Sequence, residues 1–140
     1  MKVYKEILVA IDCSPVDDVV IEHVSALALQ LGAKLHLLHV VHSHTLEQER
    51  FLREQSLMTL DVYHHTLRAA GVDARVVIRS GEPEREILKE IEENRYDLLA
   101  MAIHGHRLPG RVLFGSVSRV LRQKAAIPLL LIKPDNGERR

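Results

Sequence analysis

The sequence predicts one α/β domain over residues 1–140, built on an open parallel sheet of five strands with helices on both faces. Three observations lead to this fold class. Short apolar runs of strand length alternate with longer segments of helical periodicity, and the runs are apolar throughout, as in strands covered on both faces. In addition, 140 residues with 46% hydrophobic and 27% charged residues suit a single domain that buries a substantial core.

The first two elements are a buried strand and a capped helix. Residues 7–11 (ILVAI) form a continuous apolar run. Ser14, Pro15 and Asp17 then mark a helix start, since a serine hydroxyl accepts from a free backbone N–H, proline suits the first turn, and Asp17 completes a capping box. The helix continues up to Gly32 on an aliphatic stripe at helical spacing, made of Val16, Val20, Val24, Leu27 and Leu31.

The rest of the chain predicts four more strands, over residues 34–41, 74–78, 96–103 and 128–132. A long helix over 46–70 ends at Gly71, and one of its stripes contains Phe51, Gln55, Met58, Val62 and Thr66. The next helix begins at Pro83 and buries Ile87, Leu88 and Ile91. The last helix extends from about Ser116 to Lys124, and we expect residues 134–140 to fray.

Composition weighs against nucleic acid and membrane partners. The chain has 19 basic and 19 acidic residues, no Trp, 2 Phe and 3 Tyr, so it lacks the basic surplus and the stacking aromatics of nucleic-acid binders. No apolar run approaches the ~20 residues that a bilayer crossing needs. Cys13 is the only cysteine, which excludes an intrachain disulfide and fits a reduced, cytoplasmic location.

Two loops at the carboxyl ends of predicted strands carry the candidate site. Ligands of such folds bind beyond these strand ends, where the strand order reverses. The first loop begins at Asp12, and the second covers residues 104–115, with glycines that permit close approach of an anion and with two histidines and two arginines. Gly115 and Ser116 open the next helix, whose free amides attract anions, and Ser118 adds a hydroxyl.

A simpler interpretation of this second loop remains open, in which the glycines only punctuate a surface loop and Ser116 only caps a helix. A Walker A loop is excluded, because Gly105 and Gly110 are followed by Arg111 and Val112 rather than by Lys and a hydroxyl residue. No G-x-G-x-x-G motif follows any predicted strand, so the dinucleotide fingerprint is missing as well.

Four segments resemble the universal stress protein family, and together they extend over nearly the whole chain. They are KEILVAID at 5–12, LLHV at 37–40, YDLLAM at 96–101, and GSVSRVLR followed by IPLLLIK between 115 and 133. The ATP-binding branch of that family carries G-x2-G-x9-G-(S/T). Here the same spacing joins Ala102, Gly105, Gly115 and Ser116, with alanine in place of the first glycine.

The resemblance implies a Rossmann-like sheet of order 3-2-1-4-5, as in adenine nucleotide alpha hydrolases, and a homodimer through the strand at Pro128–Lys133. It also implies a site for ATP, with Mg²⁺ held by the phosphates. Asp12 would lie near the adenosine, and Val40 and Met101 would border the adenine. The phosphates would bind a segment containing Ala102, Gly105, Gly115, Ser116, Val117 and Ser118.

These observations support three hypotheses. The first is a homodimer that binds ATP as a regulatory ligand with little or no hydrolysis, because Asp12, Ser14 and His104 form no recognised catalytic set. The second is a dimeric interaction module with a blocked pocket that regulates partner proteins, since Ala102 and Ile103 narrow the approach to the ligand. The third is a phosphotransferase or ATPase.

Other reactive side chains have ordinary interpretations. His36, His39, His42 and His44 cluster, but His36 and His39 point to opposite faces of a strand, so three metal ligands do not converge and we expect no metal site. We interpret Cys13 as a small, half-buried residue rather than a reactive thiol.

Overall fold

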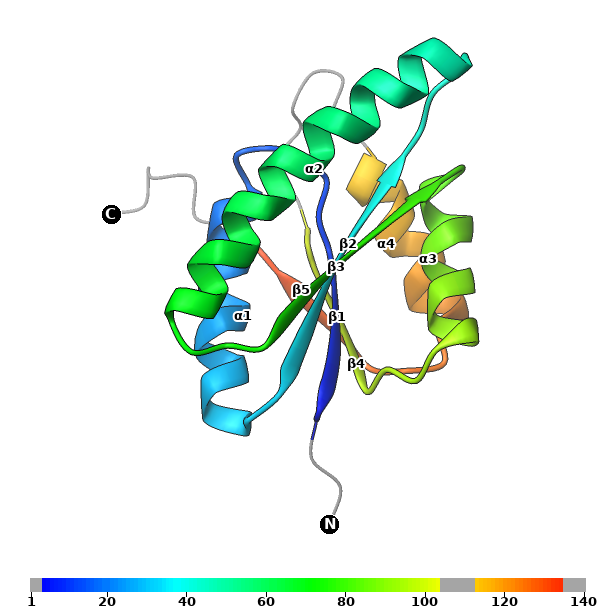
Figure 1. Cartoon of the computed structure of the whole chain (residues 1–140). Helices are drawn as coiled ribbons and strands as arrows, with labels where there is room; N and C mark the ends of the chain where they lie inside the picture. Colours follow the sequence, from blue (N-terminus) through cyan, green and yellow to red (C-terminus); the bar gives the residue numbers. More distant parts are fainter. Residues whose placement is uncertain (1–3, 104–112, 135–140) are drawn as a thin grey trace, which may run out of the picture.

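The computed structural model describes residues 4–103 and 113–134 of the chain. It is a five-stranded parallel sheet in the order β3-β2-β1-β4-β5 with helices on both faces (Figure 1), which confirms the predicted fold class and strand order. The elements are β1 (Glu6–Ala10), α1 (Asp17–Leu31), β2 (Lys34–Val41), α2 (Leu46–Ala69), β3 (Ala74–Ser80), α3 (Pro83–Glu93), β4 (Leu98–Ala102), α4 (Leu113–Lys124) and β5 (Leu129–Ile132).

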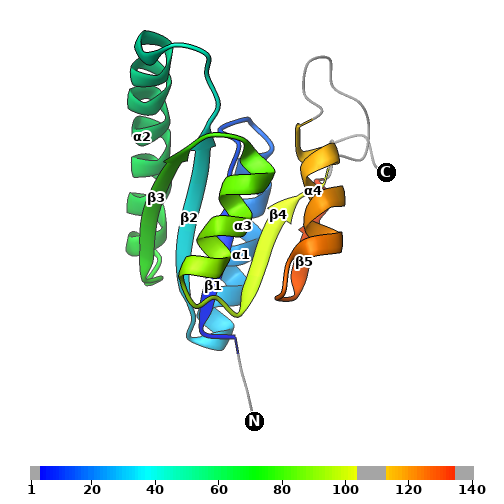
Figure 2. The same cartoon turned by 90° about the vertical axis from the view of Figure 1, so that its right-hand side faces the viewer.

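The strand order switches sides at the central strand of the sheet. β1 pairs with β2 on one side and with β4 on the other, so strands are added on one side of β1 as far as β3 and on the other side from β4 onward. Helices α1 and α2 cover one face of the sheet, and α3 and α4 cover the other (Figure 2). The loops after β1 and β4 therefore begin at adjacent strand ends, where such folds bind ligands.

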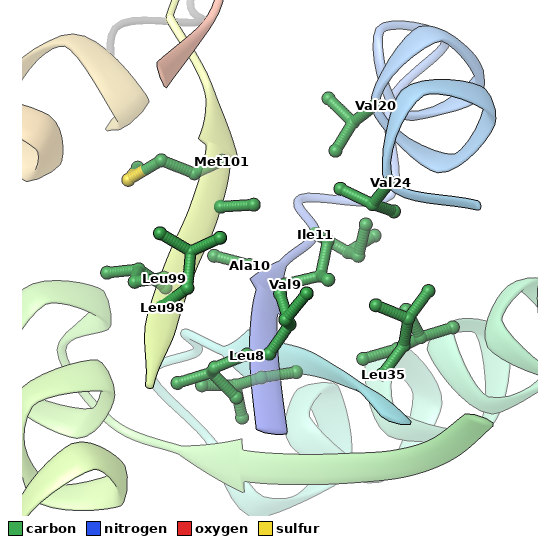
Figure 3. Close-up of a cluster of buried hydrophobic side chains, with 14 of the residues drawn as sticks. Leu8, Val9, Ala10, Ile11, Val20, Val24, Leu35, Leu98, Leu99 and Met101 are labelled. Atoms are coloured by element: carbon green, nitrogen blue, oxygen red, sulfur yellow. The ribbon is translucent and has the colours of Figure 1, made fainter. Parts of the chain in front are cut away.

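The core is aliphatic and continuous across both faces of the sheet. Leu8 and Leu99 are fully buried on neighbouring strands, and Val20 and Val24 of α1 pack toward the sheet (Figure 3). Burial of each such side chain contributes roughly 1.5–3 kcal/mol. The buried apolar strands thus form a packed sheet that holds the strand-end loops in position.

The ends of several elements differ from the prediction. β4 begins at Leu98 rather than at 96, because the Asp97 carboxylate accepts hydrogen bonds from the amides of Lys5 and Glu6 at 2.9 Å each and forms a polar start to the strand. β3 extends to Ser80, which pairs with Val41 of β2. α4 already begins at Leu113, three residues before the predicted start.

The start of α1 shows only half of the predicted capping box. The Asp17 carboxylate accepts from the Ser14 amide at 3.1 Å, as a capping box requires. The Ser14 hydroxyl is buried and makes no hydrogen bond within the described part of the chain, and the helix begins at Asp17 after Val16. The predicted serine cap is therefore wrong, because Asp17 reaches back while Ser14 does not reach forward.

The predicted stripe on α2 exists, but all five of its members are exposed. Phe51, Met58 and Val62 are all exposed, whereas Ser56, Leu60 and Leu67 are the buried residues of this helix.

Candidate functional site

The loop after β1 is a tight turn organised by two aspartates. Asp17 accepts from the amides of Asp12 (3.3 Å) and Ser14 (3.1 Å), and the Asp12 carboxylate accepts from the same Ser14 amide at 3.1 Å. Cys13 has a φ of 62°, an uncommon conformation for a non-glycine residue. The two carboxylates bind backbone amides and so fix the position of Asp12 at the strand end.

Burial changes the ionisation of this turn. Asp17 is 1% exposed, and its burial, followed by the nearby Asp12 carboxylate, raises the pKa of Asp17 to about 8. Burial likewise raises the pKa of the Cys13 thiol to about 11, against a hydrogen bond with Ser56 that lowers it. At neutral pH Asp17 is therefore mostly protonated and Cys13 is a neutral thiol, in agreement with its predicted lack of reactivity.

A cavity of about 380 Å³ opens beside this turn. Its wall combines the turn, the carboxyl end of β2, the N-terminal half of α2 and the start of α3, and it is lined by Asp12, Cys13, His39, Val40, Val41, His42, Leu52, Gln55, Ser56, Thr59 and Pro83. A smaller hollow of about 50 Å³ shares Asp12, His39, Val40 and Pro83 with it. The larger cavity falls in the size range of small-molecule sites.

His39 is a lining residue whose tautomer the structure defines. Its Nδ1 lies 2.8 Å from the carbonyl oxygen of Ile11, and burial lowers its pKa. A carbonyl only accepts, so Nδ1 carries the proton and Nε2 of the neutral ring is an acceptor. Sequence reasoning considered His39 only as a metal ligand and missed this role, although its place in the strand-end LLHV segment was a usable signal.

The structure brings together some of the predicted site residues. Asp12 and Val40 both line the cavity. Met101 and Ala102 are buried in β4 at 0% and 1% exposure and are not among the residues lining the two cavities. On α4, Val117 and Ser118 are each 1% exposed.

The predicted phosphate-binding loop falls largely outside the described residues. Gly105 lies in the part that the structure does not describe, while the backbone of Gly115 and Ser116 is part of the first turns of α4. Within residues 4–103 and 113–134, no group of three or more His, Cys, Asp or Glu side chains converges as metal ligands. No helix in these ranges is long and apolar enough to span a bilayer.

Comparison with known proteins decides the family. A model of the universal stress protein family matches residues 3–133. The chain belongs to the universal stress protein family. The resemblance inferred from the motifs is thereby confirmed over almost the whole chain.

Two curated members of the universal stress protein family are similar to this chain. Universal stress protein MJ0577 of Methanocaldococcus jannaschii is 25% identical over 158 residues, which cover 96% of this chain and 98% of that protein. Universal stress protein YxiE of Bacillus subtilis is 25% identical over 147 residues, covering 93% and 99%. The solved structure of MJ0577 has a TM-score of 0.79 at 28% identity and covers 96% of this chain and 99% of that one.

Two further solved structures share the fold and hold adenine nucleotides. The universal stress protein from Archaeoglobus fulgidus, in complex with dAMP, has a TM-score of 0.72 at 21% identity, covering 94% of this chain and 100% of that one. A universal stress protein family member from Arabidopsis thaliana, with AMP bound, has a TM-score of 0.66 at 24% identity, covering 96% and 94%. At these identities the likeness to this chain is one of fold.

Proposed function

We propose that this universal stress protein binds an adenine nucleotide, ATP with Mg²⁺, as a regulatory ligand in a homodimer, with little or no hydrolysis. The observation that carries the proposal is the cavity of about 380 Å³, which is lined by both Asp12 and Val40, two strand-end residues that the family resemblance implies for such a ligand. The AMP and dAMP complexes of structurally similar family members support the same ligand class.

The wall of the cavity suits a nucleoside. Val40, Val41 and Leu52 offer apolar surface to a base, while Gln55 and Thr59 add polar groups from α2. The Asp12 carboxylate accepts hydrogen bonds, as ribose hydroxyls require, and its negative charge repels phosphates.

The phosphates would therefore extend away from Asp12, toward the start of α4. Free amides and the positive end of the helix dipole favour anions there; α4 begins at Leu113, and Gly115, Ser116, Val117 and Ser118 lie in its first two turns. Mg²⁺ would be held by the phosphates themselves.

Calorimetric titration with Mg-ATP tests the proposal. Asp12→Asn keeps an oxygen that can accept from the Ser14 amide and removes the charge, so we expect affinity to fall about tenfold. Asp73→Asn is the matched control, because this exposed acid lies just before β3, at the amino end of the sheet. Absence of heat with the unaltered chain at millimolar Mg-ATP would refute nucleotide binding.

The proposed dimer uses β5, an edge strand of the described sheet. β5 pairs with β4 alone, and Leu129, Leu130 and Leu131 are only half-buried. An apolar edge of this kind invites pairing with a second copy. Sedimentation equilibrium at micromolar concentration should give the mass of a dimer, and a monomer mass would refute this part of the proposal.

A second candidate function, a dimeric interaction module without a nucleotide, is favoured by Ala102. This residue replaces the first motif glycine and is 1% exposed at the end of β4. Under this alternative the unaltered chain binds no ATP, and Ala102→Gly creates binding. Tight binding by the unaltered chain would eliminate it.

A further inference from the structure

An apolar stripe runs along the outward side of α2. Its members, Phe51, Met58 and Val62, are 57%, 71% and 63% exposed. They are spaced seven and four residues apart, so they share one side of the helix, and the buried Leu60 and Leu67 lie on the other side. Figure 2 shows α2 on the outer flank of the molecule, with its outward side uncovered by any other element drawn in colour.

The stripe is continuous with a groove between α1 and α2. This groove has a volume of about 450 Å³, and Val62 belongs to both the stripe and the groove wall. Ile21 and Leu67 are buried residues of the groove, and Tyr63 lies between the helices and donates its hydroxyl to Asp18 at 2.7 Å. We call the stripe and the groove together the outer face; an exposed apolar surface along a helix is the kind of surface that receives an amphipathic helix.

Acidic side chains border the outer face on both sides. Along α2, Glu47, Glu54 and Asp61 repeat every seven residues beside the stripe, and all three are exposed. On α1, Asp18 and Glu22 line the opposite rim of the groove and are also exposed. The chain has no net charge, so this concentration of carboxylates is local.

Among the described residues no arginine forms an ion pair with Glu47, Glu54 or Asp61, and the imidazole Nε2 of His65 lies 3.8 Å from the Asp61 carboxylate. Arg50 and Arg53 line a separate hollow with Leu46 and Glu49, and Arg53 lies 3.3 Å from the Glu49 carboxylate. The outer face therefore combines an apolar centre with negative rims, a pattern that complements an apolar ridge flanked by cations.

We propose that the outer face binds a basic amphipathic helix of a partner protein, with Lys or Arg on both flanks of its apolar ridge. Large exposed aliphatic and aromatic side chains in line mark an interaction site. A second copy of this chain fits less well, because two α2 helices packed antiparallel would set the Glu47–Glu54–Asp61 row of one against that of the other. The proposal does not depend on nucleotide binding.

A pair of synthetic helices tests this proposal on the full chain. One peptide has leucine at heptad positions a and d with lysine at e and g; the other has glutamate at e and g. We expect saturable binding of the lysine peptide by fluorescence anisotropy, weakened by added salt, and much weaker binding of the glutamate peptide. Met58→Glu should weaken the lysine peptide about tenfold.

Leu46→Glu is the matched control, since Leu46 is 86% exposed on α2 but lies on another side of the helix from the stripe. Equal binding of the two peptides, equal effects of Met58→Glu and Leu46→Glu, or no saturable binding would each overturn the proposal. So would a loss of self-association in Met58→Glu by sedimentation, because that result would assign the outer face to a second copy. Circular dichroism of both variants verifies that they remain folded.

Discussion

Asp17→Asn should change how the stability of this protein depends on pH. The pKa of Asp17 is about 8 in the native state, whereas the unfolded chain releases this proton near the ordinary aspartate pKa of 3.8. The raised native pKa means that the stabilising contribution of this group is complete at low pH. This contribution is lost as pH rises, because the unfolded state alone releases the proton and its free energy falls relative to that of the native state.

The magnitude follows from these two pKa values. Between about pH 5 and pH 7 the unfolded carboxyl is ionised and the native one is not, so the free energy of unfolding falls by roughly 3 kcal/mol through this group. That is a large part of the 5–15 kcal/mol typical of a domain. Asparagine has no proton to release and loses one acceptor for the Asp12 or Ser14 amide, at a cost of about 1 kcal/mol independent of pH.

Urea denaturation at several pH values measures this difference. Circular dichroism is the suitable signal, because the chain has no tryptophan. We expect the unaltered protein to lose stability relative to Asp17→Asn as pH rises, while Glu22→Gln, an exposed acid of the same helix, follows the unaltered protein. Parallel curves for Asp17→Asn and the unaltered chain would show that Asp17 is ionised in the native state and would refute the reasoning.

Two further substitutions test the packing behind the site. Gly81→Ala should lower the free energy of unfolding in urea by about 1–3 kcal/mol, because the φ of Gly81 is +140° and the new Cβ would lie 2.8 Å from Glu86 Oε2. Gly32→Ala is the control, since Gly32 has open space around it and its substitution should cost only about 1 kcal/mol. Arg79→Met should cost about 2 kcal/mol at neutral pH, since Arg79 contacts Glu86 at 2.9 Å and Glu90 at 2.7 Å and both carboxylates are largely buried. Arg79 holds the pKa of Glu86 below its usual range, so the destabilisation by Arg79→Met should shrink as pH falls. Lys89 is a half-exposed partner of Glu86, so Lys89→Met should change the free energy of unfolding by under about 0.5 kcal/mol.

The architecture was predictable because each strand carries its own signal. Apolar runs such as residues 7–11 are buried because helices cover both faces of a parallel sheet, and Gly32 ends α1 with a φ of 66° as its position indicates. Strand ends were less predictable, because they depend on partners. Asp97 shortens β4 through the amides of a distant segment, and Ser80 extends β3 because Val41 pairs with it.

The orientation of α2 could not be read from its sequence. Both the outward stripe of Phe51, Met58 and Val62 and the inward pair of Leu60 and Leu67 have helical spacing. The N-terminal turns of α2 also extend past the carboxyl ends of β2 and β3 (Figure 1), so the sheet does not cover them. Periodicity identifies the helix, and only tertiary packing decides which stripe is buried.

Only some residues of the candidate site could be predicted from the sequence. Asp12 and Val40 were predictable, because the ends of adjacent parallel strands must meet at one edge of the sheet. Gln55, Ser56 and Thr59 complete the cavity from a helix far along the chain, where the helical phase decides which residues face inward. No local pattern marks them, since Ser and Thr on a helix usually face solvent.

The protonation of Asp17 affects the orientation in which a ligand would bind in the cavity. Of the two aspartates of the turn, Asp17 is buried and keeps its proton at neutral pH, whereas Asp12 lines the cavity. Two adjacent charges would repel an anionic ligand more strongly and strain the turn, whereas one charge leaves an acceptor for hydroxyl groups. Under the proposed function, this arrangement directs ribose to Asp12 and the phosphates to the start of α4, so that Asp17 sets the polarity of ligand binding without contacting the ligand.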